Sequence, residues 1–181
     1  MKNIPGDMPA EEFRRWARET ADWMAHFLEQ VGEQRVLPTV APGATAAALP
    51  PKPPEQGEPM EIILADFERL ILPAVTHWNH PGFLGYFATT ASGPGILAEM
   101  LTATVNPNGM LWRTSPASTE LEQVVLDWLW QLMGLPDRVF GMIHDTASTS
   151  TLHAVAAARE AQEDLQIRVR GQSGAPALVL Y

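Results

Sequence analysis

The sequence predicts an α/β fold in which a helical N-terminal segment precedes the first part of a parallel sheet. Apolar residues recur at three- and four-residue steps over several segments, as they do on amphipathic helices. Near the end, an apolar run at 138–143 leads into a helical segment reaching about residue 164, and a second apolar run follows at 175–181. Strand, helix and strand in this order make a βαβ unit, which belongs to a parallel sheet.

The first predicted helix runs from residue 9 to about Gly32, and its apolar stripe carries bulky aromatic side chains. The stripe consists of Phe13, Trp16, Ala17, Thr20, Met24, Phe27, Leu28 and Val31. No other helix is predicted close behind it in the sequence. We therefore interpret the stripe as a docking surface, for example on a second subunit, with an ordinary core face as the alternative.

The remaining elements follow from turn and capping signals. Residues 38–59 contain seven prolines and predict an extended connection with little regular structure, and the helix after it is expected to stop at Pro73. Residues 76–95 and 106–114 are rich in turn residues, and 96–105 is helical. Ser115 and Pro116 then predict the start of a helix with a buried apolar stripe, which Gly134 ends. We divide the chain into a helical segment, 1–90, and the start of a larger domain, 91–181.

Composition restricts the class of protein. The chain has 181 residues, 46% of them hydrophobic, which is enough for a folded core. Its net charge of −9 argues against binding to nucleic acid or to an anionic membrane surface. It contains no cysteine, which excludes a disulfide framework and a thiolate nucleophile, and we therefore expect a cytoplasmic protein. The N-terminus lacks the apolar run of a signal peptide.

Residues 145–151, DTASTST, place five hydroxyl side chains at the start of a predicted helix. A helix start leaves backbone N–H groups without partners, and one Ser, Thr or Asp is enough to cap it. Small residues with free N–H groups at a helix start also favour a bound phosphate. The pattern thus indicates either a cap alone or a phosphate cradle.

Three segments together resemble one known family. VTHWNHPGFLGYF, SPASTELEQVVLDWL and DTASTSTLHAVAAARE are similar, in order and spacing, to the pyridoxal-phosphate (PLP)-dependent group II decarboxylases, and nearest to their aromatic-L-amino-acid branch. The resemblance covers nearly the whole chain and the N-terminal portion of the much longer family members. It implies the type I PLP-dependent, aspartate aminotransferase-like fold, with an N-terminal helical segment that clasps the partner of a homodimer.

The resemblance also implies the site residues. The positions that hold the cofactor phosphate fall on Thr146, Ala147 and Ser148. The positions that line the substrate pocket fall on Trp78, Tyr86, Phe87, Ala88 and Thr89, with Asn108 and Met110 contributed by the neighbouring subunit. This chain departs from the aromatic branch at Ala88, where proline is usual, and at Asn108 and Met110, where larger apolar residues are usual.

The family's Schiff-base lysine, ring-stacking histidine and pyridine-facing aspartate have no counterpart here. Lysine occurs only as Lys2, at the chain tip, and Lys52, among prolines. We therefore expect no catalytic residue in this chain. We expect an aromatic L-amino acid to be decarboxylated to an amine and carbon dioxide only within a longer or split enzyme that includes the C-terminal portion. The alternatives are an aldehyde synthase using the same chemistry and a non-catalytic helical dimerisation module.

Overall fold

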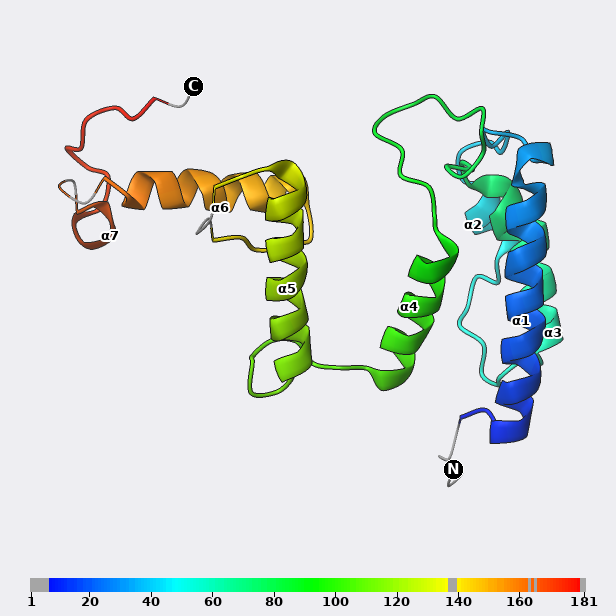
Figure 1. Ribbon diagram of the computed structural model, residues 1–181. Helices are drawn as coiled ribbons and strands as arrows, with labels where there is room; N and C mark the ends of the chain where they lie inside the picture. The colour runs from blue at the N-terminus through cyan, green and yellow to red at the C-terminus, as the bar shows by residue number, and fades with distance from the viewer. Residues whose placement is uncertain (1–6, 137–139, 163, 165, 180–181) are drawn as a thin grey trace. The chain divides into compact units, whose positions relative to one another are not determined.

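The computed structural model describes residues 7–136, 140–162, 164 and 166–179. The chain divides into two compact units, Met1–Glu99 and Met100–Tyr181. Within the described residues all regular structure is helical, as Figure 1 shows. The same part of the chain contains no helix that is both long enough and apolar enough to cross a membrane.

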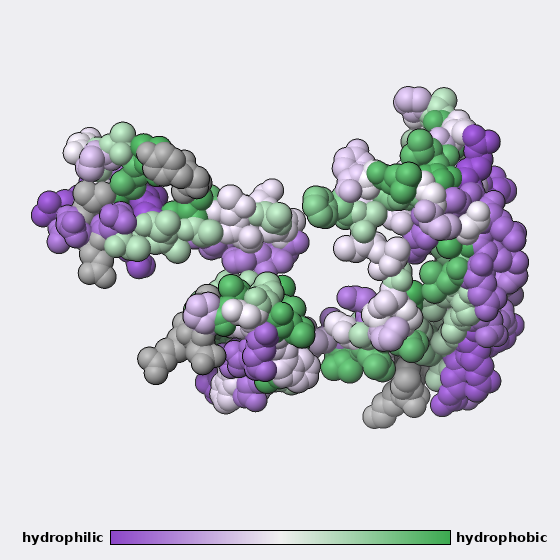
Figure 2. All heavy atoms as spheres, turned by 45° about the horizontal axis from the view of Figure 1, so that its top comes forward, coloured by the Kyte–Doolittle hydropathy of each residue, from purple (hydrophilic) through white to green (hydrophobic). Residues whose placement is uncertain are grey.

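Helix α1, Ala10–Gln30, is the longest element of the first unit and continues into a 3₁₀ turn, η1, at Val31–Glu33. Two glutamates, Glu11 and Glu12, lie in its first turn, where the partial positive charge of the helix end favours them. Hydrophilic residues cover one side of this helix, at the right of Figure 2. The predicted position and amphipathic character of the first helix are therefore confirmed.

The aromatic side chain of Trp23 on α1 packs against a second helical segment of the same unit. This segment consists of α3 (Met60–Asp66), the π-helical turn η2 (Phe67–Ile71) and the 3₁₀ turn η3 (Leu72–Ala74). The Trp23 ring stacks on Phe27 at 5.4 Å and meets the Phe67 ring edge-on at 5.5 Å. Trp23 is not among the predicted stripe residues, and Phe13 at the start of the stripe is 54% exposed, so the interpretation of the stripe as a docking surface stays a prediction. Phe67 lies far along the chain from Trp23, where local periodicity gives no sign of the contact.

Two other local predictions need correction in this unit. A short helix, α2 (Ala44–Ala48), forms inside the proline-rich connection, because its run of alanines has high helix propensity. The helical turns after Met60 also continue to Ala74 and do not stop at Pro73. Pro73 lies in the first turn of η3, a position at which no backbone N–H is needed.

The second unit contains α5, α6 and α7, and helix α4 (Gly93–Val105) crosses the boundary between the units. Helix α5, Pro116–Met133, begins and ends as predicted: the Ser115 hydroxyl accepts from the Ser118 N–H, and Gly134 ends the helix at φ 66°. Helix α6 covers Ala147–Glu160, and α7 covers Ile167–Arg170. Figure 1 shows α6 crossing α5 near the end at which α5 stops.

The apolar stripe of α5 is exposed, contrary to prediction. Leu121 is 63% exposed, Trp128 61% and Leu132 83%. The pattern that identifies an apolar face is local, whereas its burial depends on a partner, and no described helix of this unit covers these side chains.

The two runs predicted as strands, 138–143 and 175–181, are not strands in their described parts. Residues 140–143 and 175–179 have no regular structure. A strand exists only through backbone hydrogen bonds to a neighbouring strand, and no such ladder occurs among the described residues. Positions 138, 139, 180 and 181 lie outside the described part.

Candidate cofactor and substrate sites

Thr146 caps helix α6. Its backbone is extended, with φ −145° and ψ 157°, and its Oγ1 accepts a hydrogen bond from the Thr149 N–H at 3.2 Å. The hydroxyls of Thr146 and Thr149 also lie 2.9 Å apart, and the Ser150 N–H donates to the Thr146 carbonyl at 3.0 Å. One hydroxyl thus satisfies the capping requirement of this helix.

The next two residues keep their donors free. Among the described residues, no acceptor is in hydrogen-bonding contact with the N–H groups of Ala147 and Ser148 or with the Ser148 hydroxyl. Both side chains are exposed. Because these N–H groups lie at the positive end of the helix, the start of α6 offers three donors in a favourable field for an anion. This donor set fits a phosphate group.

A hollow of about 680 Å³ opens beside the cap and lies within the second unit. Thr146 and Ala147 line it at the α6 end, and Leu126 and Trp130 line it from α5. Gly141 forms part of its wall, where an added Cβ would come 3.1 Å from Leu126 Cδ2. Ala147, one of the two residues with free donors, therefore adjoins a space of the size that small-molecule sites have.

The residues of α5 that line this hollow are not among the site residues predicted from the sequence. Leu126 and Trp130 are four residues apart, so they share one face of a helix, and this spacing was the available signal. Which face turns toward α6 depends on tertiary packing.

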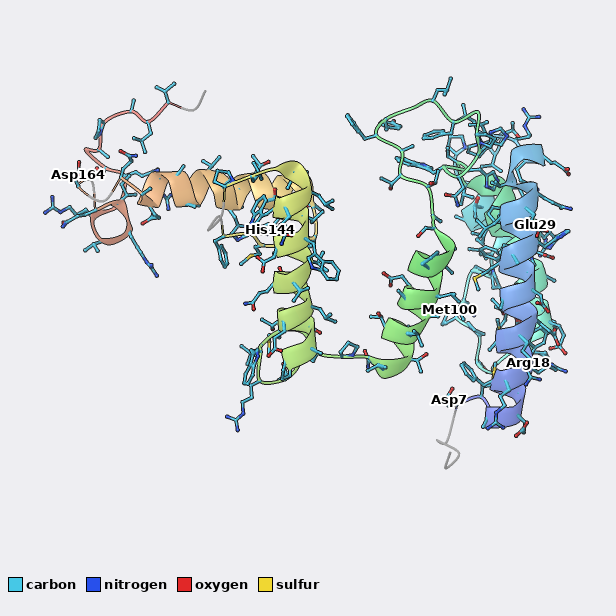
Figure 3. All side chains as sticks on the ribbon, in the orientation of Figure 1. Asp7, Arg18, Glu29, Met100, His144 and Asp164 are labelled. Atoms are coloured by element: carbon cyan, nitrogen blue, oxygen red, sulfur yellow. The ribbon has the colours of Figure 1, made fainter. Side chains whose placement is uncertain are left out.

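Two histidines also line this hollow. The rings of His144 and His153 stack with centroids 4.7 Å apart, and Figure 3 shows His144 beside α5 and the start of α6. His153 Nδ1 lies 2.9 Å from the Thr149 carbonyl oxygen. Since a carbonyl only accepts, Nδ1 carries the proton and ties His153 to its own helix.

The predicted substrate residues of the first unit lie in one loop, residues 76–91, which we call the aromatic loop. The rings of Trp78 and Tyr86 stack at 5.7 Å with 5° between their planes, and Phe83 contacts Trp78 at 5.0 Å. Tyr86 is 91% exposed at φ 53°, a left-handed conformation that is uncommon for a bulky residue. The loop therefore presents aromatic rings at its surface, followed by the exposed residues Phe87, Ala88 and Thr89.

Asn108 and Met110 lie in the second unit. The Asn108 Oδ1 accepts from the Met110 N–H at 3.0 Å, and its carbonyl accepts from the Thr114 hydroxyl at 2.9 Å. Met110 is 74% exposed. Asn108 thus shapes its own turn, and the side chains of Asn108 and Met110 are both exposed. The predicted site residues fall into three local groups: the aromatic loop, this turn and the start of α6.

Lys52 is exposed in the proline-rich connection, where it neighbours Pro51 and Pro53. Lys2 lies outside the described residues. Within the described part, no group of three or more His, Asp or Glu side chains is arranged to hold a metal ion.

A family model, the pyridoxal-dependent decarboxylase conserved domain, matches residues 42–174. The chain belongs to this family. The resemblance derived from the three sequence segments is thereby confirmed, and so is pyridoxal phosphate as the cofactor of the family.

Curated relatives agree with the family model. The aromatic-L-amino-acid decarboxylase of Cavia porcellus is 44% identical over 160 residues, which cover 84% of this chain and 33% of that protein. The enzyme of the same name from Drosophila melanogaster is 42% identical over 161 residues, 84% of this chain and 32% of that protein. The histidine decarboxylase of Drosophila melanogaster is 38% identical, over 84% of this chain and 19% of that protein. The chain spans about a third of the length of the first two relatives.

Solved structures extend the likeness to three dimensions. Catharanthus roseus tryptophan decarboxylase in complex with L-tryptophan has a TM-score of 0.83 and 35% identity, over 93% of this chain and 36% of that chain. Oryza sativa TDC with PLP and tryptamine has a TM-score of 0.81 and 29% identity, over 96% and 37%. Rhodiola rosea 4-hydroxyphenylacetaldehyde synthase has a TM-score of 0.67 and 37% identity, over 71% and 28%. The type I PLP-dependent fold class is confirmed.

Proposed function

We propose that this chain forms part of an enzyme that decarboxylates an aromatic L-amino acid to its amine and carbon dioxide with pyridoxal phosphate. The observation that carries the proposal is the set of free donors at the start of α6, in a chain of the pyridoxal-dependent decarboxylase family. Relatives named aromatic-L-amino-acid decarboxylase and a neighbour solved with L-tryptophan support the aromatic substrate class.

The residues at the start of α6 would hold the cofactor by its phosphate. The backbone N–H groups of Ala147 and Ser148 and the Ser148 hydroxyl would donate to phosphate oxygens, while Thr146 keeps the helix start in shape by capping it. Bound pyridoxal phosphate supplies an electron sink for the electron pair left when carbon dioxide departs. The chain's contribution to that chemistry is binding and orientation.

The aromatic loop would contribute apolar area for the substrate side chain. Trp78, Tyr86 and Phe87 offer ring surfaces that are exposed, with Ala88 and Thr89 beside them. Asn108 and Met110 are proposed to come from the partner subunit of a homodimer. A second carboxylate on the substrate would need a cationic partner when buried, and none of these seven residues is Arg or Lys. An aromatic or apolar side chain therefore suits the set.

The lysine that forms the imine with the cofactor is proposed to be a residue other than Lys52. A lysine that forms an imine has to reach the cofactor in a desolvated pocket, whereas Lys52 is exposed between prolines. We propose that a further stretch of the enzyme supplies it, and that the assembled enzyme is a cytoplasmic homodimer.

A second candidate is an aldehyde synthase, which the likeness to the Rhodiola rosea enzyme favours. A non-catalytic helical dimerisation module is the remaining alternative. To test this, the assembled enzyme is incubated with pyridoxal phosphate and with L-tryptophan, L-tyrosine, L-phenylalanine or L-glutamate. The amounts of amine, aldehyde, ammonia and carbon dioxide formed are then measured. Equal amounts of amine and carbon dioxide from an aromatic substrate support the proposal. Aldehyde with ammonia identifies the synthase, and no product with any substrate identifies the module.

A further inference from the structure

We propose that His80 is a positioning residue for the aromatic loop, which it holds against the end of α1 as a neutral imidazole with its proton on Nε2. The loop's role toward substrate rests on the proposed function. The anchoring itself rests on contacts within the first unit.

Both ring nitrogens of His80 have backbone partners, and these partners fix the tautomer. Nδ1 lies 2.8 Å from the Gly82 nitrogen, whose N–H donates to it. Nε2 lies 3.1 Å from the Gly32 carbonyl oxygen, which only accepts. Nδ1 must therefore be unprotonated and Nε2 must carry the proton. One side chain thus joins residue 82 of the loop to residue 32 beyond α1.

The local sequence leaves room for this ring. A Cβ on Gly82 would come 3.1 Å from both Nδ1 and Cε1 of His80, closer than most contacts of real side chains, so glycine lets the imidazole approach the backbone. Pro81 lies over Gly32, where an added Cβ would meet its ring at 3.7 Å. The segment His80–Gly82 is therefore seated closely on the turn that follows α1.

Neighbouring contacts hold the same segment. The His77 N–H donates to the Val36 carbonyl at 3.0 Å, and the buried His77 ring lies 5.7 Å from that of Phe27. The Asn79 Oδ1 accepts from the Ala91 N–H at 2.8 Å. Asn79 thus joins the two ends of the aromatic loop, and His80 joins the loop to the turn that follows α1.

These anchors matter because the rest of the loop projects outward. Leu84 is 94% exposed, Tyr86 91% and Phe87 101%, so they gain little from packing in this unit. A loop held by few packing contacts must be restrained by hydrogen bonds if its rings are to stay in place. A restrained loop loses less conformational entropy when a ligand binds, which favours affinity. His80 is accordingly expected to act on substrate affinity through Trp78 and Tyr86.

Three variants of the assembled enzyme distinguish the contributions of the two His80 hydrogen bonds, one to Gly82 and one to Gly32. His80→Ala removes both, His80→Asn keeps an acceptor near the position of Nδ1, and His80→Gln keeps a donor near the position of Nε2. His26→Ala removes an exposed histidine of α1 and is the matched control. Hydrogen exchange of peptides covering 76–91 measures the anchoring, and kcat and KM for an aromatic amino acid measure its consequence.

We expect His80→Ala to speed exchange over 76–91 and to raise KM about tenfold, with kcat and bound pyridoxal phosphate little changed. His80→Asn and His80→Gln should each restore part of both effects, and His26→Ala should change neither. Unchanged exchange in His80→Ala would overturn the anchoring. Faster exchange with an unchanged KM would overturn the positioning role while leaving the proposed function intact. If the wild-type enzyme decarboxylates nothing, the proposed function fails, and the exchange data still decide whether His80 holds the loop.

Discussion

Trp23 of α1 and Glu68 of the turn η2 are joined by a hydrogen bond of 2.5 Å from the indole Nε1 to the carboxylate Oε1. The same indole stacks on Phe27 and meets Phe67 edge-on. Arg15 reinforces the contact through an ion pair with Glu61 of α3 at 3.6 Å. Trp23 is therefore the residue at which polar and aromatic contacts between the two helical segments of the first unit coincide.

Replacing Trp23 tests this packing. Trp23→Phe keeps an aromatic ring but loses the hydrogen bond, and should reduce the free energy of unfolding by about 1 kcal/mol. Trp23→Ala also removes the ring contacts and should cost about 3 kcal/mol. Thermal unfolding of the enzyme measures both, with Glu29→Ala, at an exposed position of α1, as the control. Equal losses for Phe and Ala at position 23 would show that the ring contacts contribute nothing.

Replacing hydroxyls at the start of α6 tests the phosphate cradle. The double variant Thr146→Val with Ser148→Ala should weaken pyridoxal phosphate retention tenfold or more, which corresponds to the loss of hydrogen bonds to a charged group at about 1.5–3 kcal/mol. Ser148→Ala alone leaves the Thr146 cap in place and should show a smaller loss. Cofactor affinity after dialysis is the measurement. Thr151→Ala, an exposed hydroxyl further along α6, is the control. Wild-type affinity in the double variant would contradict the cradle.

The composition of the proposed pocket predicts substrate preference. The complete enzyme should give a higher kcat/KM with tryptophan, tyrosine or phenylalanine than with glutamate, because the proposed pocket residues include no cation to pair with a second carboxylate. Amine formation under matched conditions measures this ratio. A preference for glutamate over all three aromatic amino acids would disprove the substrate class.

The 181 residues by themselves should have no decarboxylase activity. Lys2 and Lys52 are the only lysines, and Lys52 is exposed. The large apolar side chains exposed on α5, such as Leu132, should also make the isolated chain poorly soluble. After incubation with pyridoxal phosphate and exhaustive dialysis, no imine absorbance band and no amine should be detectable. A stable lysine adduct with turnover would contradict the proposed need for a lysine from elsewhere in the enzyme.

The sequence by itself determined the features whose causes are local. Ser115, Pro116 and Gly134 set the ends of α5 because a side-chain oxygen, a missing N–H and a left-handed backbone each act within one turn. Thr146 likewise caps α6. The family also followed from the sequence, since three short segments in register carry it.

Tertiary structure alone decided which surfaces meet. Phe67, the aromatic partner of Trp23, lies beyond a proline-rich connection, and periodicity indicates that a face is apolar without indicating what covers it. The same reason explains why the α5 stripe was identified correctly but is exposed. The runs at 140–143 and 175–179 are apolar but have no regular structure. A strand requires hydrogen bonds to a paired neighbour, which apolar composition alone does not supply. The two backbone partners of His80 likewise depend on the fold, which brings Gly32 to its ring from a distant part of the chain.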